Sequence, residues 1–441
     1  MRIILPDSRG QLTKRLNCAC KSPSARSKRF SGIIRYTLPL ALILVSVTLV
    51  ACNGDEEPST SSTPSPEEVT FTIGNLTDQT GVAASAVSII DTTLDDMVDY
   101  YNEENLIPGV KLEVVSHDTQ YDAALAKTGY ERLKAKGADI IWTPVTATIP
   151  VLKPVADQDE FPVFAASANL DMLTPPGYVF SLGTIPQYDA LTLLKWIAEN
   201  DWDYEANGPA RIGGAGWKDD YSPLFFDGMK EYARAHPDQF EWTGGYLTDF
   251  GFIWTSAIEG LKDCDYVYPP VPMHVFVTDY RAAGYDAKFL ATDPHAGFLD
   301  MIDKGNYWDE IDGTLFIRAS RWWTEEGVII DLTKELLQEN HAGKAEEIMR
   351  SGVGYLSTSC LYQLLHIIKN AAENAGPANL DSQAVFEAAI TYTEDIDGVD
   401  RYSFDESKRC STNYYIVYEA DAERQNLYRA DSEWLPMVTE P

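Results

Sequence analysis

The chain has 441 residues, of which 45% are hydrophobic, and a formal net charge of −32 at pH 7. At roughly 150 residues per domain this length predicts two or three domains, and such an acidic surface argues against nucleic acid or anionic lipid headgroups as partners. The charge is uneven: residues 1–51 carry nine Lys or Arg and one Asp, so the remaining chain has a net charge of −40. This excess favours a role in solubility.

A basic leader precedes the apolar run Leu38–Ala51, which has only 14 residues. A membrane-spanning helix needs about 20 apolar residues, so the run is too short to span a bilayer. A basic flank, a short apolar stretch and a small residue at its end are typical of a secretory signal. We therefore expect residues 1–51 to be a signal peptide.

Cys52 marks a change of composition. The preceding residues, Leu49-Val50-Ala51, resemble with Cys52 a bacterial lipobox, in which the cysteine is acylated and becomes the mature N-terminus. Several acyl chains give stable membrane anchoring, whereas one gives only marginal binding. The alternative is an ordinary signal that ends beside a cysteine. Residues 52–68 are rich in Ser, Thr, Pro, Asp and Glu, a composition that predicts a flexible tether.

Beyond the tether, short strand-like runs alternate with longer runs of helical spacing. The first set is strand 69–76, helix 86–104, strand 110–116, helix 123–136, strand 138–142, helix 149–157 and strand 161–165. The pattern restarts with helix 190–199, strand 210–215, helix 224–235, strand 243–246, helix 255–262, strand 266–268, helix 273–283 and strand 287–291. This alternation predicts parallel sheets covered by helices on both faces.

The C-terminal part has a different pattern. A long amphipathic helix is expected over Tyr355–Ala375, because its apolar residues share one face. Gly376 and Pro377 are expected to end this helix. A hairpin-like end is expected from Tyr402–Phe404 and Tyr414–Tyr418, which flank a polar turn.

Together these elements predict an α/β fold of two doubly wound, Rossmann-like lobes joined by a three-segment hinge. We expect crossings near Gln187, Thr314 and Phe404. Lobe 1 would then comprise residues 69–187 plus 315–404, and lobe 2 residues 188–314 plus 405–441. Ligands of parallel sheets bind at the carboxyl ends of the strands, so the predicted site is the cleft between the lobes, which would close around its ligand.

Four stretches carry a family resemblance. They are IGNLTDQTG (73–81), ADIIWTPVTATIPVLKPVADQDEFPVFAASANLDML (138–173), TDFGFIWTSAIEGLKDCDYVY (248–268) and FVTDYRAAGYDAKFLATD (276–293). In order and spacing, and with the lipobox and tether, the chain resembles the substrate-binding lipoproteins of ABC importers, specifically the branched-chain amino-acid (Leu/Ile/Val-binding) type. The resemblance implies the type I periplasmic binding protein fold.

The resemblance also implies a site for a ligand with an amino-acid headgroup. Thr146 and Thr148, at the mouth of a helix, match the family's carboxylate-binding positions, although plain N-capping is the alternative. Ser167 and Asn169 match a second ligand-contacting loop, with an ordinary turn as the alternative. Asp293 matches the acid that meets the α-ammonium group, or is a turn residue beside Pro294.

Aromatic residues complete the expected cleft. Tyr221 matches a cleft aromatic with Trp217 nearby, and packing is the alternative role for both. Tyr268 stands beside Pro269, which replaces a family aromatic. The first loop has no aromatic near Ala84–Val87. The sequence therefore does not define which side chain the ligand carries.

No P-loop, G-x-S-x-G, HExxH or CxxC motif occurs, and the paired acids are explained by the acidic composition, so we expect a binding protein and not an enzyme. Cys264, Cys360 and Cys410 permit at most one disulfide, and we expect no cofactor and no metal site. The expected partners are a small amino-acid-like or carboxylate solute, ABC permease subunits and, through the lipid anchor, the extracytoplasmic face of a bacterial membrane. The protein is expected to be monomeric. A lipid-anchored sensor that is not coupled to transport is the alternative function.

Overall fold

The computed structural model describes residues 68–219 and 221–441. The predicted signal peptide, Cys52 and the tether as far as residue 67 lie outside the described residues. Within the described ranges, no helix combines the length and apolar character needed to cross a membrane.

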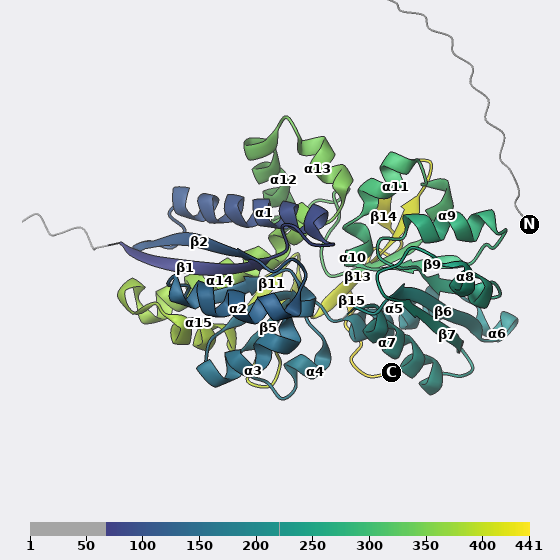
Figure 1. Cartoon of the computed structure of the whole chain (residues 1–441), viewed down its shortest axis with the longest axis horizontal. Coiled ribbons are helices and arrows are strands. Elements are labelled where there is room, and N and C mark those ends of the chain that lie inside the picture. The colour runs from purple at the N-terminus through teal and green to yellow at the C-terminus, as the bar shows by residue number, and fades with distance from the viewer. Residues whose placement is uncertain (1–67, 220) are drawn as a thin grey trace, which may run out of the picture. The chain divides into compact units, whose positions relative to one another are not determined.

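The first sheet is entirely parallel, with the strand order β2-β1-β3-β4-β5 (Figure 1). Its strands are β1 (Val69–Thr77), β2 (Val110–Asp118), β3 (Ile140–Thr143), β4 (Val163–Ser167) and β5 (Val179–Thr184). They are connected by α1 (Ala84–Glu103), α2 (Ala123–Ala135), η1 (Thr146–Thr148), α3 (Ile149–Asp159) and α4 (Leu170–Leu173).

Helices cover both faces of this sheet, which explains why its central strands β3 and β4 are apolar on both sides. Phe71 and Ile73 of β1 pack in one core with Leu94 of α1. Leu76 of the same strand packs in another core with Leu133 of α2. The parallel sheet predicted from alternating strands and helices is confirmed.

The second sheet has the order β14-β13-β10-β9-β8-β6-β7, and β15 pairs with β13. Its strands are β6 (Ala210–Trp217), β7 (Phe240–Thr248), β8 (Tyr266–Tyr268), β9 (Lys288–Ala291), β10 (Leu315–Arg318), β13 (Tyr414–Asp421), β14 (Asn426–Arg429) and β15 (Leu435–Pro436). Its helices are α5 (Pro186–Asn200), α6 (Tyr204–Asn207), α7 (Ser222–Ala235), α8 (Thr255–Leu261), α9 (His274–Ala282), α10 (Asp293–Ala296), α11 (Leu299–Gly305) and η2 (Asp309–Ile311). Helices α5 and α7 share one core on a face of this sheet, and α8 and α9 pack in the core of the opposite face.

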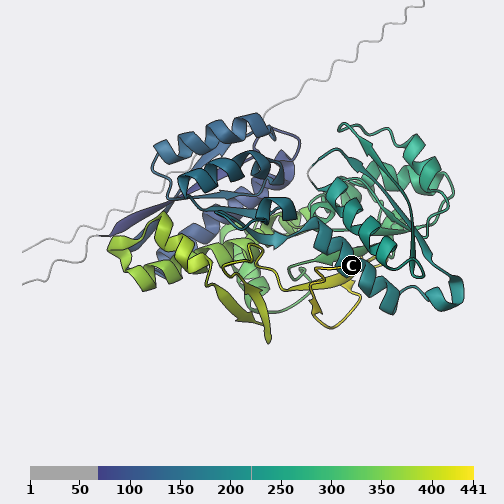
Figure 2. The same ribbon diagram turned by 90° about the horizontal axis from the view of Figure 1, so that it is seen from below.

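The chain between β10 and β13 returns to the first sheet. It forms α12 (Val328–His341), α13 (Ala345–Ser351), η3 (Gly354–Ser357), α14 (Thr358–Ala375), η4 (Pro377–Asn379), α15 (Ser382–Ala389), β11 (Thr393–Ile396) and β12 (Val399–Ser403). Figure 2 shows the yellow-green α14 and α15 against the blue first sheet, and Leu361 and Leu364 of α14 share the core of α1.

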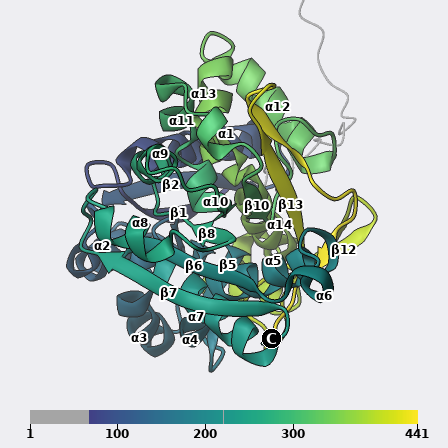
Figure 3. The ribbon, with the colours of Figure 1, turned by 90° about the vertical axis from the view of Figure 1, so that its right-hand side faces the viewer.

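The structure refines two expectations about this region. Tyr402 of β12 forms an antiparallel bridge with Thr412 across the polar turn, so the end is hairpin-like there. Strand β12 otherwise pairs with β11, and β13 pairs antiparallel with β14 and with β10, beside which it lies in Figure 3. Strand β10 belongs to the second sheet through its pairing with β9 and β13, so the chain leaves this sheet after Arg318 and not near Thr314. The remaining lobe limits stay a prediction.

Candidate ligand-binding cleft

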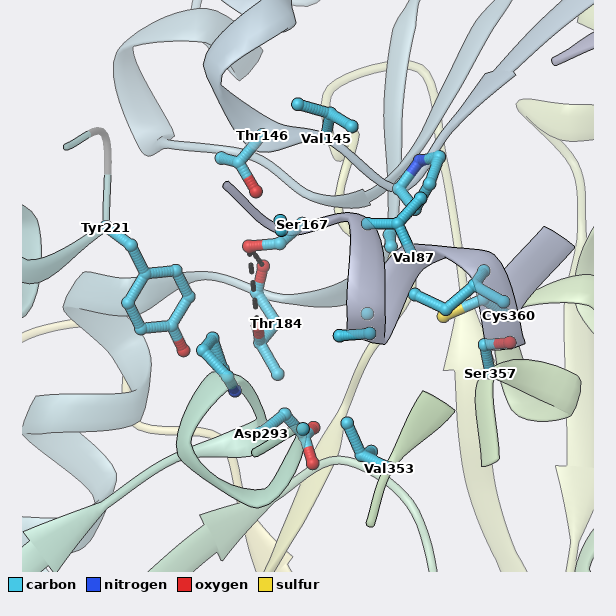
Figure 4. A pocket seen from close by; sticks show the side chains of 18 of the residues that line it. Val87, Val145, Thr146, Ser167, Thr184, Tyr221, Asp293, Val353, Ser357 and Cys360 are labelled. Atoms are coloured by element: carbon cyan, nitrogen blue, oxygen red, sulfur yellow. Dashed lines mark hydrogen bonds between the residues drawn. The ribbon is translucent and has the colours of Figure 1, made fainter. Parts of the chain in front are cut away.

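A cavity of about 230 Å³ lies at the carboxyl ends of both sheets. The first lobe contributes residues at or just after the ends of β3, β4 and β5, including Thr146, Ser167 and Thr184. The second contributes residues at the ends of β6 and β9, including Tyr221 and Asp293 (Figure 4). This is the location that parallel sheets provide for ligands, because successive strands end at the same edge and their loops converge there.

Three of the hydroxyl groups that line the first-lobe wall lie at the ends of β3, β4 and β5, and Ser357 and Ser359 also line this wall. Ser167 Oγ donates to the carbonyl oxygen of Thr184 at 2.9 Å, and Thr184 Oγ1 donates to Ser167 Oγ at 3.4 Å. Thr146 is half-buried at the start of η1, and its hydroxyl has no hydrogen-bond partner in the part of the chain that the structure describes. Of these three hydroxyl groups at the strand ends, Thr146 is therefore the one whose proton remains available to a ligand.

Tyr221 connects the second-lobe wall to a buried acid. Its hydroxyl donates to Asp189 Oδ2 at 2.6 Å. Asp189 lies in the first turn of α5 and is fully buried. Desolvation raises the pKa of Asp189 to about 8, although the hydrogen bond from Tyr221 opposes this shift. The Asp189 carboxyl group is therefore mostly protonated at neutral pH, and Tyr221 is fixed in place by a neutral partner.

Asp293 on the cavity wall already has a counter-charge. Its Oδ1 lies 2.7 Å from Nη1 of Arg318, whose side chain is fully buried at the end of β10. The guanidinium also donates through Nη2 to Ser320 Oγ at 2.8 Å. Burial raises the pKa of Asp293, and the Arg318 charge acts in the opposite direction. The pair thus presents little net charge to the cavity.

Comparison with known families places this architecture. A family model described as periplasmic binding protein matches residues 70–424. The chain belongs to the periplasmic binding protein family. Among curated proteins, none matches its sequence.

Solved structures share the fold of this periplasmic binding protein. A branched-chain amino-acid ABC transporter protein from Thermus thermophilus with bound valine is 18% identical, with a TM-score of 0.70 over 83% of this chain and 96% of that one. The branched-chain amino-acid substrate-binding protein of Streptococcus pneumoniae in complex with isoleucine is 18% identical, with a TM-score of 0.65 over 83% and 99% of the two chains. A solute-binding protein of R. palustris in complex with benzoate is 13% identical, with a TM-score of 0.67 over 84% and 98%. The predicted two-lobed type I fold is confirmed.

In this periplasmic binding protein, three of the expected site residues lie behind the cavity wall. Thr148 is buried, and its hydroxyl donates to the carbonyl oxygen of Val145 at 2.7 Å. Asn169 caps α4 by accepting from the backbone N–H of Met172 at 2.9 Å. Tyr268 is fully buried, and its ring packs on Phe225. These side chains support the wall, whereas Thr146, Ser167, Trp217, Tyr221 and Asp293 line it.

An aromatic group at the cleft was only partly visible in the sequence. Trp217 lines the cavity and packs against Phe250 at 5.1 Å between ring centroids. Phe250 in turn meets Tyr121 of the first lobe edge to face, at 6.4 Å. Both Phe250 and Tyr121 line the cavity. Helical and strand periodicity gives no signal for such loop aromatics, so sequence reasoning missed them.

The other end of the cavity is apolar. Val87 and Ile90 of α1 face it together with Leu182 of β5 and with Leu356 and Cys360 near the start of α14. Figure 4 shows Val87 and Cys360 on the side away from Tyr221. The sequence predicted the α14 helix but gave no sign that its first turn reaches the ligand cleft, because the two helices are far apart in the chain.

The thiols and the metal-ligating side chains are the remaining groups of the described part that could carry chemistry. Cys264, Cys360 and Cys410 are all free and buried. Burial raises the pKa of the Cys360 thiol to about 12, so at neutral pH this group is neutral. Within residues 68–219 and 221–441, no group of three or more His, Cys, Asp or Glu side chains is placed to hold a metal ion.

Proposed function

We propose that this protein is an extracytoplasmic solute-binding lipoprotein of an ABC importer, which captures an amino acid or a related small carboxylate and delivers it to a permease. The observation that carries the proposal is the cavity between the two sheets, at the carboxyl ends of their parallel strands. Its walls place hydroxyl groups of the first lobe opposite an acid and a tyrosine of the second.

The arrangement suits capture by closure. A ligand carboxylate on the first lobe would meet the hydroxyl of Thr146, with Ser167 beside it, because neutral donors can hold a carboxylate without a counter-charge. Trp217, Tyr221 and Asp293 of the second lobe would then close over the ligand. Hinge closure of this kind is a common response of two-lobed binding proteins.

The apolar end of the cleft would receive the ligand's side chain. A group placed among Val87, Ile90, Leu356 and Cys360 leaves water for an apolar surface, and burial contributes about 25 cal/mol per Å² of apolar area. Small-molecule sites typically combine such an apolar body with a few polar groups that fix orientation. The ligand is therefore expected to be a small acid with an apolar side chain.

The compartment completes the proposal. Membership of a periplasmic binding protein family supports an extracytoplasmic location. The lipid anchor rests on Cys52 and its lipobox alone, with residues 52–68 as the tether that would hold the binding lobes near the membrane. The expected mature protein thus begins at the acylated cysteine.

Titration calorimetry tests the proposed function. Purified protein that starts at residue 53 is titrated with amino acids and with their counterparts that lack the amino group, such as leucine with 4-methylpentanoate and phenylalanine with 3-phenylpropanoate. We expect at least one member to bind with a Kd in the micromolar range or below, and Thr146→Val to weaken it by about tenfold, since one hydrogen bond to a charged group contributes about 1.5–3 kcal/mol. Folded protein that binds no member would contradict the proposal.

A further inference from the structure

The cavity wall carries a second carboxylate, Asp219, which the sequence comparison did not single out. It follows β6 and precedes α7. Its Oδ1 accepts from the backbone N–H groups of Tyr221 at 3.1 Å and of Ser222 at 2.7 Å. Within the described residues, its Oδ2 has a single, long contact, 3.4 Å from Ser222 Oγ. One oxygen of Asp219 thus fixes the start of α7, while the other has capacity for a further donor.

The two acids on the wall differ in their neutralisation. Asp293 lies against the buried guanidinium of Arg318 at 2.7 Å. Asp219 is half-buried and has no cationic side chain among its hydrogen-bond partners in the described residues. The partners that compensate its charge in the described part are therefore backbone and hydroxyl dipoles.

The charges around the cavity favour a ligand with an ammonium group over a ligand with only a carboxylate. Among the described residues that line it, Asp219 and Asp293 are acidic and none is Lys, Arg or His. A ligand with only a carboxylate would bring a negative charge to a wall that already holds one uncompensated anion, and like charges repel strongly where water is excluded. An ammonium group would instead neutralise Asp219 through a charge-assisted hydrogen bond.

We propose that the ligand of this cleft is an apolar molecule that carries an ammonium group, and that Asp219, and not Asp293, is the acid that receives it. This inference rests on the proposed function, because it assumes that the solute binds in this cavity. It assigns to Asp219 the choice between an amino acid and a carboxylate that lacks the amino group. Asp293 with Arg318 instead forms a neutral part of the wall.

The variant Asp219→Asn tests the assignment. Asparagine retains an oxygen that can accept from the N–H groups of Tyr221 and Ser222, so the start of α7 is preserved while the charge is removed. The matched control is Asp249→Asn, which removes a charge of the same sign at an 80% exposed side chain that pairs with Lys218 and does not line the cavity. Thermal unfolding of both variants verifies the fold.

Calorimetry is then performed with ligand pairs that differ only in the amino group, and with 2-phenylethylamine, which has the amine and no carboxylate. Wild-type protein is expected to bind the amine-bearing member at least tenfold more tightly. Asp219→Asn should lose at least about tenfold of affinity for that member, because truncation of one partner of a desolvated charge pair has a large effect. It should change binding of the amine-free member by less than threefold, and Asp249→Asn should change neither.

The outcomes separate the two proposals. If wild-type protein binds the amine-free acids equally or better, solute capture stands and the ammonium assignment is overturned. It is also overturned if Asp219→Asn retains the preference for the amine, or if Asp293→Asn abolishes that preference while Asp219→Asn does not. If no member of any pair binds, the proposed function fails and this inference fails with it.

Discussion

A single buried acid, Asp189, illustrates how a side chain can fix the cleft at a cost to stability. The carboxyl group is fully buried below Tyr221, and its second oxygen, Oδ1, has no hydrogen-bond partner in the described residues. Burial raises its pKa in the folded protein to about 8 from the ordinary 3.8. The neutral acid therefore retains Tyr221 in the wall without placing a further negative charge near Asp293.

This pKa shift predicts a pH dependence of stability. Between pH 4 and pH 8 the folded state holds a proton on Asp189 that the unfolded state has released, so the folded state binds more protons and the free energy of unfolding falls as pH rises. Within this window the contribution is about 1.4 kcal/mol per pH unit. Asp189→Asn keeps a neutral acceptor for Tyr221 and should flatten this slope in urea unfolding at pH 5, 6, 7 and 8. Glu199→Gln, at an exposed position of the same helix, is the control, and equal slopes in both variants would contradict the assignment.

The residue scale also shows how far a sequence can define a site. Asp293 could be placed at the cleft because it follows a strand-like run, and the structure has it on the wall. Its partner Arg318 could not be found, because the pair is formed by the parallel pairing of β9 with β10, and local spacing does not specify which strands are neighbours. The position of Asp293 on the cavity wall could thus be inferred from the sequence, whereas its electrostatic environment required the fold, and its contact with a ligand stays a prediction.

At the scale of elements, α1 and α14 form the apolar end of the cleft. The side chains of α1 that pack against the sheet recur at helical spacing over Val87, Leu94 and Val98. Ala86 lies one residue before Val87 and lines the cavity, whereas Ser85 is exposed and does not. Ala86 of this helix thus faces the cleft, whereas the neighbouring Ser85 faces the outer surface.

Ala86→Trp tests whether this end receives the ligand's side chain. The indole would occupy cavity volume, so calorimetry should show at least about tenfold weaker binding of ligands with a large apolar group and a smaller loss for alanine-sized ones, since a few buried methylene groups at about 0.8 kcal/mol each account for that factor. Ser85→Trp adds the same side chain on the outside and should bind as the wild type does. A loss in both variants, or in neither, would show that the side chain lies elsewhere.

Secondary-structure elements differ in how well they can be predicted from the sequence. Strand β8 and helix α2 were located to within one residue because apolar periodicity is a local property. The pairing of β13 was missed, because Tyr414–Asp421 read locally as half of a hairpin. In the structure its antiparallel partner β10 lies about 100 residues earlier in the chain, and such long-range pairing leaves no periodic signal.

At the scale of the molecule, Arg401 connects segments that lie far apart in the chain. Arg401 of β12 is buried, and its Nη2 donates to the carbonyl oxygen of Ala319, just after β10, at 2.8 Å. Its guanidinium also lies 3.6 Å from the ring centroid of Trp434, near the C-terminus. This one side chain therefore connects β12, the segment that follows β10, and the C-terminal segment before β15.

The acidic excess is likewise a property of the whole chain, and it predicts how stability responds to salt. Ion pairs such as Lys218–Asp249 and Lys111–Glu113 have side chains about half exposed or more. Pairs of this kind contribute about 0–1 kcal/mol each, so their screening has a small effect. Repulsion among the carboxylates left without a cation acts over the whole surface and destabilises the compact state.

Between 0.01 M and 1 M NaCl the screening length falls from about 30 Å to about 3 Å. The thermal unfolding midpoint at pH 7 should therefore rise by several degrees over that range. KCl should reproduce the rise, since the effect depends on ionic strength and not on the cation. A midpoint that stays constant or falls would show that the ion pairs outweigh the repulsion.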